Sequence, residues 1–316
     1  MSSRFSFNDF ETFSDAVKGY DLDIRQLSRG SFSAEMQHVS HGAVVINRFL
    51  TSLRVEAYGG PPPGALTFGV PTGHCDPFVW RHMSTLANSI QVYHSDTELA
   101  LVTNPLFEAI DVSISQDEFA RLCQVWEFPE PERLIGNREM VICRSAEMED
   151  LRASLKYVCD TLELGPERLL QDAELRNLVS FQVPYMIASA LISSELAPVN
   201  PSAARREYAL RNAIEYIQET ANEAVTIETV CNEIGVGMRT LQRAFRDRYD
   251  LSPKFYLQSQ KLNSIYKILL RAHPQTTRVT DVAMDQGYWH LGQFASDYRR
   301  FFGELPSDTL QRPGWQ

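Results

Sequence analysis

The apolar positions in the last third of the chain follow one pattern that occurs twice. Each copy has a short segment with apolar residues at helical spacing, then a glycine, then a longer segment whose apolar residues again recur every three or four positions. The first copy consists of Ile227, Val230, Gly235, Leu241, Phe245, Tyr249 and Pro253, and the second of Val279, Val282, Gly287, Phe294, Tyr298, Phe302 and Pro306. This repeat predicts two helix-turn-helix units.

Capping residues mark the starts of the predicted helices. Thr226 is an N-cap candidate for the first short helix, and Ser252 followed by Pro253 begins a long one. The long helix is predicted to run to Arg271, and its 19 residues would form a rod of about 28 Å. Because successive major-groove segments on one side of DNA lie about 34 Å apart, such a rod would hold two reading helices roughly one DNA turn apart.

Each copy also predicts a recognition helix with a polar face, over residues 238–249 and 290–302. Arginine can donate two hydrogen bonds to guanine, glutamine pairs with adenine, and threonine can contact the thymine methyl group. A solvated helix face usually mixes both charges, whereas the polar face of the first of these helices carries three arginines. We therefore expect DNA contacts from Arg239, Thr240, Gln242, Arg243 and Arg246 in the first helix and from His290, Gln293, Ser296, Arg299 and Arg300 in the second.

The pattern differs in the first two thirds of the chain. Between about residues 21 and 115, short runs rich in β-branched residues alternate with clusters of turn residues, which is typical of an antiparallel β-sandwich or a small barrel. Helical spacing then appears over residues 116–126, 147–164 and 167–195, and the last stretch is predicted to bend near Pro184.

The segment 197–202 has two prolines and no periodicity, so it is predicted to be a linker. The sequence therefore predicts an α+β chain of two domains. Residues 1–200 would form a β-barrel or sandwich with appended helices, and residues 201–316 an all-α double helix-turn-helix domain.

Composition excludes several other classes of protein. No apolar run approaches the roughly 18 residues of a membrane span, and the N-terminus lacks the basic start and apolar stretch of a signal peptide. We therefore expect a cytoplasmic protein with no membrane partner. The five cysteines are scattered and form no C-x-x-C pair, so neither a disulfide framework nor a zinc site is indicated.

The net charge of −10 is distributed unevenly along the chain. Residues 203–316 hold 15 Lys and Arg against 13 Asp and Glu, whereas residues 1–202 hold 15 against 27. The excess of acidic residues thus belongs to the first domain. Because phosphate binding depends on where the cations lie, the negative total does not exclude DNA as a partner.

Two segments of the repeat resemble the AraC/XylS family of transcription regulators. GYWHLGQFASDYRRFFGELPSDTLQ (287–311) is similar to the closing signature of that family, and IGVGMRTLQRAFRDRYDLSPKFYL (234–257) to its first helix-turn-helix. The resemblance implies a seven-helix domain whose recognition helices enter successive major-groove turns of promoter DNA, usually to activate transcription, with RNA polymerase as a partner. One departure is Gly237-Met238, where the family often has a capping serine.

The first domain resembles, over residues 26–32 and 66–71, the sensor half of ethanolamine-operon regulators. This resemblance implies a β-domain that binds a small-molecule effector, with helices appended for dimerisation. Aromatic side chains in a small β-domain are more often core than pocket, and Arg81 fits either a ligand carboxylate or the surface. The candidate pocket residues are Phe68, Phe78, Trp80, Arg81 and Tyr93.

These features together predict a transcription regulator that binds DNA sequence-specifically, responds to a small molecule, needs no cofactor and is associated with the nucleoid. Helices within residues 147–195 are predicted to form a homodimer interface, or alternatively to cover the β-domain. Their apolar stripes are Leu151/Leu155/Val158/Leu162 and Tyr185/Met186/Ala190.

Two other classes of protein stay open. One is a cupin-like metal enzyme fused to a DNA-binding tail, although the histidine spacing lacks the His-x-His cluster of cupins and no catalytic motif is present. The other is a protein-interaction adaptor that no longer binds DNA.

Overall fold

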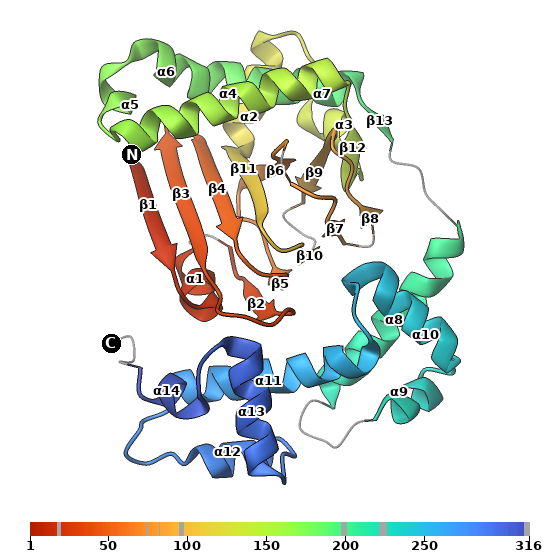
Figure 1. Cartoon of the computed structure of the whole chain (residues 1–316). Coiled ribbons are helices and arrows are strands. Elements are labelled where there is room, and N and C mark those ends of the chain that lie inside the picture. Colours follow the sequence, from red (N-terminus) through yellow and green to blue (C-terminus); the bar gives the residue numbers. More distant parts are fainter. Residues whose placement is uncertain are drawn as a thin grey trace. The chain divides into compact units, whose positions relative to one another are not determined.

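The computed structural model describes residues 1–17, 20–73, 75–81, 83–94, 98–196, 201–220 and 226–312. These residues form two compact units (Figure 1). The N-terminal unit comprises Met1–Ile24 and Ser33–Pro198, and the C-terminal unit comprises Arg25–Phe32 and Val199–Gln316. No helix in the described part of the chain combines the length and the apolar character needed to cross a bilayer.

The N-terminal unit is built on an antiparallel sheet of eight strands. Their order across the sheet is β1-β3-β4-β11-β6-β9-β12-β13. The strands are β1 (Ser2–Phe7), β3 (Ala34–His41), β4 (Val44–Thr51), β6 (Ala65–Pro71), β9 (Ser89–Tyr93), β11 (Phe107–Ser115), β12 (Met140–Ile142) and β13 (Glu195–Leu196). The central strands are buried along nearly their whole length because both faces of the sheet are covered.

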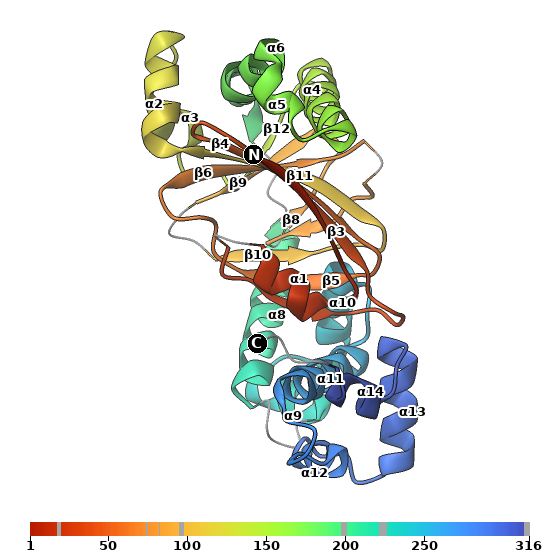
Figure 2. The ribbon, with the colours of Figure 1, turned by 90° about the vertical axis from the view of Figure 1, so that its left-hand side faces the viewer.

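A smaller five-stranded sheet and helix α1 (Phe10–Ala16) lie on one face of the large sheet, and the later helices on the other (Figure 2). The smaller sheet has the order β2-β5-β10-β7-β8. Its strands are β2 (Asp23–Gln26), β5 (Val55–Gly59), β7 (Val79–Trp80), β8 (Met83–Ser84) and β10 (Leu99–Val102). The two sheets are separate, so the unit is the predicted sandwich rather than a closed barrel.

The helices of the N-terminal unit cover the other face of the large sheet. They are α2 (Gln116–Val125), α3 (Pro131–Ile135), α4 (Ser145–Leu164), α5 (Arg168–Gln171), α6 (Ala173–Asn177), the π-helical turn η1 (Leu178–Gln182) and α7 (Val183–Ser193). The chain is irregular just before Pro184, where the Val183 N–H donates to the carbonyl of Leu178, five residues back. A proline ring clashes with the carbonyl four residues before it, which accounts for the wider turn at this place.

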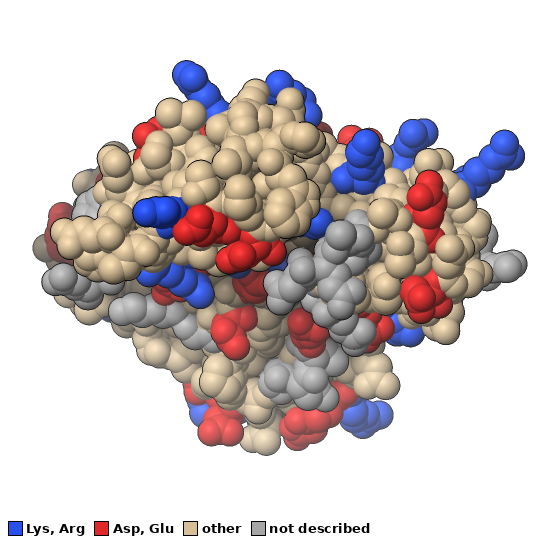
Figure 3. All heavy atoms as spheres, turned by 90° about the horizontal axis from the view of Figure 1, so that it is seen from below, with Lys and Arg blue, Asp and Glu red and all other residues tan. Residues whose placement is uncertain are grey.

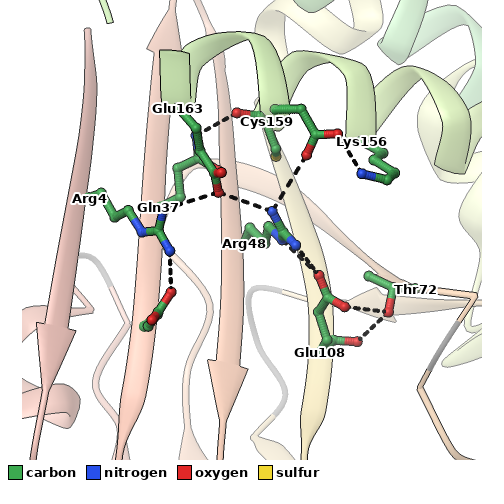
Figure 4. A network of polar contacts seen from close by, with 10 residues as sticks. Arg4, Gln37, Arg48, Thr72, Glu108, Lys156, Cys159 and Glu163 are labelled. Atoms are coloured by element: carbon green, nitrogen blue, oxygen red, sulfur yellow. Dashed lines mark hydrogen bonds and ion pairs between the residues drawn. The ribbon is translucent and has the colours of Figure 1, made fainter. Parts of the chain in front are cut away.

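Helix α4 is held on the sheet by apolar packing and by a polar network. Its Leu155 and Val158 are fully buried in the core under the sheet. At the end of α4, Glu163 accepts a hydrogen bond from Arg48 of β4 at 3.3 Å, and Arg48 also pairs with Glu108 of β11 at 2.6 Å (Figure 4). Because Arg48 is only about one-fifth exposed, these pairs fix the helix to two strands at once.

The C-terminal unit contains the seven predicted helices. They are α8 (Pro201–Glu219), α9 (Ile227–Glu233), α10 (Met238–Tyr249), α11 (Pro253–Arg271), α12 (Val279–Asp285), α13 (Leu291–Phe302) and α14 (Pro306–Leu310). Helix α11 is the central rod, with α9 and α10 near one end and α12 to α14 near the other (Figure 1). The α10 side chain Tyr249 stacks on Tyr256 of α11 at 4.7 Å between ring centroids, and Phe302 of α13 packs on Tyr266 at the same distance.

A short segment from early in the sequence, residues 25–32, completes this unit; we call it the clasp segment. Its Gln26 is buried and donates through its side-chain amide to the carbonyl of Phe301, at the end of α13. The Gly30 N–H donates to the same carbonyl at 2.9 Å. The clasp segment therefore satisfies a carbonyl that the helix terminus leaves without an intrahelical partner.

Candidate nucleic-acid interface and ligand cavity

The first helix-turn-helix is formed by α9 and α10. Thr226 caps α9 by accepting from the Thr229 N–H, and Gly235 adopts the left-handed conformation (φ 64°) that ends it. Gly237 is the N-cap of α10 and offers no side-chain cap, as the departure from the family pattern implied. The apolar face of α10 is buried. Its five candidate DNA-contacting residues are all exposed: Arg239, Thr240, Gln242, Arg243 and Arg246.

The second helix-turn-helix has the same construction from α12 and α13. Gly287 (φ 81°) forms the turn, and Gly303 (φ 82°) ends α13. Phe294 and Tyr298 are buried against the rest of the unit. The candidate contacts on the opposite face are exposed: His290, Gln293, Ser296, Arg299 and Arg300.

Two residues of the second recognition helix add to what the sequence predicted. Trp289, just before α13, is 74% exposed, which is unusual for so large an apolar side chain. Asp297 accepts a hydrogen bond from Gln293 at 2.9 Å and lies 3.9 Å from the guanidinium of Arg300. Asp297 thus orients two of the expected DNA contacts, and its position one helical turn from each is visible in the sequence.

The charge on the recognition helices is predominantly positive. The exposed arginines of α10 and α13 are Arg239, Arg243, Arg246, Arg299 and Arg300. Figure 3 shows Lys and Arg side chains that project from the surface, with Asp and Glu side chains between them. Cations gathered on the recognition helices attract the DNA backbone even where the total charge is negative.

A cavity lies inside the N-terminal unit, between its two sheets. The centre of a water molecule can occupy about 70 Å³ of this cavity without contacting its walls too closely. Since about 10–15 Å³ of such space accommodates one water molecule, the cavity has room for a ligand of roughly one ring. Most of its walls are apolar, with Phe13 of α1, Phe49 of β4 and Phe107 of β11 among them. None of the described residues that line it is Lys, Arg or His.

A buried carboxylate is the chemical centre of this cavity. Asp111 of β11 is 6% exposed and accepts hydrogen bonds from the hydroxyls of Tyr20 and Tyr93, each at 3.2 Å. Burial raises the pKa of Asp111 to about 7, although the two tyrosine hydrogen bonds act in the opposite direction. Burial also raises the pKa of both tyrosines well above its ordinary value, so they remain neutral donors.

Strand alternation decides which of the predicted pocket residues reach the cavity. Tyr93 lines it, as does Phe78 just before β7, whereas Phe68 points to the helix-covered side and packs on Phe119. Trp80 is buried behind Tyr93, with its indole N–H donating to the Glu139 carbonyl. Arg81 pairs with the carboxylate of Glu139 and is not part of the cavity lining.

The sequence interpretation missed Asp111, the group with the strongest electrostatic effect in the cavity. Its signal was present, because Asp111 is the one charged residue in the mostly apolar run Ala109 to Ile114. A charged residue in the middle of a buried strand needs a polar partner or a ligand.

The metal-enzyme alternative gains no support from the described side chains. Within the described ranges, no three His, Cys, Asp or Glu residues lie close enough together to hold a metal ion. His38 is hydrogen-bonded to Asn47 at 2.8 Å, and His94 to the Arg138 carbonyl at 2.9 Å. The five cysteines are free thiols, and Cys123, Cys143 and Cys159 are buried.

Comparisons with known proteins agree with the geometry of the C-terminal unit. Residues 230–312 match the family model described as "Helix-turn-helix domain". The chain is 26% identical over 251 residues to the "XylDLEGF operon transcriptional activator 3" of Pseudomonas putida, covering 76% of this chain and 70% of that protein. It is 28% identical over 158 residues to the "XylDLEGF operon transcriptional activator" of the same organism, covering 50% of this chain and 47% of that protein.

Among solved structures, the chain is similar to the "AraC-like transcriptional activator CuxR", with 15% identity and a TM-score of 0.43 over 84% of this chain and 96% of that one. The chain spans about half the length of the first curated relatives it matches.

Proposed function

We propose that the chain is a transcription regulator of the AraC/XylS type, which binds promoter DNA sequence-specifically and responds to a small molecule. One observation carries the DNA-binding half of this proposal. All ten predicted contact residues are exposed on two recognition helices that are packed on one rod, α11. A helix-turn-helix reads DNA through the exposed face of its second helix, and here two such faces belong to one unit.

The two helices are proposed to read DNA differently. The α10 face has three arginines beside Thr240 and Gln242, so it combines strong phosphate attraction with donors for guanine and adenine. The α13 face includes Asp297, which engages Gln293 and approaches Arg300. We therefore expect two unlike half-sites about one DNA turn apart, in an asymmetric or direct arrangement.

Substitution of one arginine in each recognition helix tests the proposal. A binding site is first selected from a random DNA library with the wild-type full chain, and affinities are then measured by gel shift at several salt concentrations. Arg243→Ala and Arg299→Ala are each expected to lower affinity by about 5- to 150-fold, equivalent to roughly 1–3 kcal/mol. Arg121→Ala is the matched control, since Arg121 is exposed on α2 and pairs only locally with Glu118.

Two outcomes would contradict the DNA-binding proposal. The first is a library that yields no enriched sequence. The second is that both arginine variants retain the wild-type affinity and salt dependence, as Arg121→Ala does. Either result would favour the adaptor alternative, in which the helical unit binds another protein.

We propose that the effector binds in the cavity around Asp111 and that the bound regulator activates transcription through RNA polymerase on the nucleoid. The support is the enclosed position of the cavity between two sheets and its mixture of apolar walls with a few polar groups, which is typical of small-molecule sites. No catalytic step is assigned to the chain or needed by this proposal.

We also propose a homodimer, with a narrower interface than the sequence indicated. The α4 stripe of Leu151, Leu155, Val158 and Leu162 is buried against the sheet, so it covers the β-domain. On the other stripe, Tyr185 is 43% exposed and stacks with Phe128 beside the partly exposed Phe181. This aromatic surface is the proposed contact. A light-scattering mass of the full chain that remains monomeric at high concentration would rule it out.

A further inference from the structure

The polar end of the cavity has an arrangement that suggests its ligand. Gln91 of β9, Gly69 of β6 and Asp111 of β11 are directly paired across three adjacent strands. Directly opposed residues of antiparallel strands point to the same face of a sheet, so all three belong to the cavity side, and all three line the cavity. The residue in the middle has no side chain, and the Tyr93 side chain passes over it to donate to Asp111.

Sheet geometry and the neighbours of Gly69 determine how far apart these polar groups lie. Two strand spacings place the backbones of Gln91 and Asp111 about 9–10 Å apart. A Cβ atom at position 69 would lie 3.1 Å from the Tyr93 hydroxyl oxygen and 3.2 Å from the Gln91 Oε1. The Tyr93 hydroxyl and the Gln91 amide oxygen therefore both lie over Gly69 at the polar end of the cavity, and Asp111 accepts from Tyr93.

The hydrogen bonds already made at this end leave acceptors rather than donors. Tyr20 and Tyr93 donate their hydroxyl protons to Asp111. The amide nitrogen of Gln91 donates to the Ser89 hydroxyl at 3.0 Å, so it is the Oε1 of this amide that lies beside Gly69 at the cavity. A ligand at this place therefore meets a carboxylate and an amide oxygen, both of which accept hydrogen bonds.

The walls around the polar end suit a cation better than an anion. Phe78 and Phe107 make an edge-to-face pair at 5.0 Å, and Phe13 and Phe49 make another at 6.2 Å. Aromatic faces attract organic cations, and a carboxylate in an apolar site gains most from an opposite charge. An anionic ligand would be repelled by Asp111 and would find no described cation in the lining.

We propose that the cavity binds a small organic amine, whose ammonium group pairs with Asp111 and donates to Gln91 while its apolar body lies among the aromatic side chains. This inference rests on the proposed function for its regulatory meaning, but the binding event is independent of DNA. The proposal excludes carboxylates as ligands, because the negative charge of Asp111 would repel them.

Three probes of the same ring size distinguish the ligand classes: benzylamine, benzyl alcohol and benzoate. Their binding to the wild-type full chain is measured by isothermal titration calorimetry at pH 8, where Asp111 is ionised, and in the absence of DNA. We expect benzylamine to bind at least tenfold more tightly than benzyl alcohol, and benzoate to show no saturable binding. Asp111→Asn keeps the shape of the side chain and removes its charge, so it should reduce benzylamine affinity at least tenfold, to the level of the alcohol.

Controls keep the test independent of folding. Asp117→Asn removes an exposed carboxylate on α2 and should leave all three affinities unchanged. If Asp111→Asn does not fold, Tyr93→Phe removes only one hydroxyl from the same site and should weaken benzylamine more than benzyl alcohol. The comparison of the three probes on the wild-type chain needs no variant.

The proposal is overturned if benzoate binds as well as benzylamine, if Asp111→Asn keeps the preference for the amine, or if none of the probes shows saturable binding. Its failure is distinguishable from failure of the proposed function. A chain that selects a DNA site but does not bind benzylamine refutes only the amine, and a chain that binds benzylamine but selects no DNA refutes only the DNA-binding regulator.

Discussion

The side-chain amide of Asn263 binds both backbone groups of Gln26. Its Oδ1 accepts from the Gln26 N–H at 2.9 Å, and its Nδ2 donates to the Gln26 carbonyl at 2.8 Å. Both residues are 1% exposed, so water does not compete for these groups. Asn263 lies in the middle of α11, and the clasp segment is therefore fixed to the rod that also supports both recognition helices.

We expect Asn263→Ala to destabilise the C-terminal unit by about 2–3 kcal/mol, because it leaves a buried N–H and a buried carbonyl of Gln26 without partners. The measurement is urea unfolding of the full chain. Asn232→Ala is the matched control, since Asn232 is exposed on α9. Equal stability of the two variants would mean that the clasp segment contributes nothing to the unit.

The clasp segment also restricts which residue can occupy position 303, where the chain has Gly303. It has a φ of 82°, and a Cβ there would lie 2.2 Å from the Ser31 Oγ. Gly303→Ala should therefore cost about 1–3 kcal/mol, from the left-handed backbone and from the clash. Adding Ser31→Gly removes the clash alone, so the double variant should recover part of the loss and remain about 1 kcal/mol below Ser31→Gly. Thermal unfolding of the four chains separates the two contributions, and a double variant no more stable than Gly303→Ala would contradict the clash.

The contrast between these two findings and the recognition helices shows what local sequence can predict. The bounds of α10 and α11 follow from signals within a few residues, namely a cap, a glycine turn and a 3.6-residue period. Gln26 is hydrogen-bonded to Asn263, which is 237 positions later in the sequence, and to Phe301, which is 275 positions later. No periodicity connects such distant residues, so the packing of the clasp segment with the C-terminal helices could not be predicted from local patterns.

Asp297 is predicted to influence DNA specificity more than DNA affinity. It accepts from Gln293 and from Gln258, which restricts the side chain of Gln293. Asp297→Ala removes a negative charge from the DNA-facing helix and frees Gln293, so affinity for random DNA should rise a few-fold, while the ratio of selected-site to random-DNA affinity falls about tenfold. Asp281→Ala, an exposed aspartate on α12, serves as the control. Competition gel shifts with random DNA measure both quantities; an unchanged ratio would show that Asp297 does not orient a base contact.

Asp111 is predicted to make the stability of the wild-type chain depend on pH. Its pKa in the folded state, about 7, lies above that of an unfolded aspartate, so the folded state holds the proton more tightly. The resulting stabilisation is complete below about pH 4 and is lost as the pH rises through about 7. The titratable groups that face Asp111 are Tyr20 and Tyr93. Across the sheet, Asp111 is paired with Asn47, and Asn47 is paired in turn with His38.

Asp111→Asn removes this dependence. As the pH rises from 4 to 8, the free energy of unfolding of the variant should increase relative to that of the wild type by up to about 4 kcal/mol, at about 1.4 kcal/mol per pKa unit. Urea unfolding at pH 5, 6, 7 and 8 measures the difference, and Asp117→Asn should show none. A constant difference between Asp111→Asn and wild type across this range would place the pKa of Asp111 near its ordinary value.

The sequence indicated aromatic residues in the sensor domain but not the side of the sheet to which each points. Phe68 and Gly69 are neighbours in β6, yet Phe68 belongs to the helix-covered core and Gly69 to the cavity. Alternation along a strand fixes the two sides only after the register with the neighbouring strands is known. Both faces of this sheet are buried, so exposure does not distinguish them, and Asp111 is the one charged residue among the buried positions of β11.

Gly69→Ala is expected to weaken ligand binding while preserving the fold. The added Cβ would lie 3.1 Å from the Tyr93 hydroxyl and 3.2 Å from the Gln91 Oε1, so these two side chains at the polar end of the cavity must move by a few tenths of an ångström. Stability should change by less than about 1.5 kcal/mol, but benzylamine affinity should fall at least tenfold. Gly60→Ala is the matched control, because a Cβ there meets nothing within 4 Å. Affinity for the selected DNA site, measured without ligand, should be the same in both variants. If Gly69→Ala binds benzylamine as tightly as Gly60→Ala does, the effector site lies elsewhere in the chain.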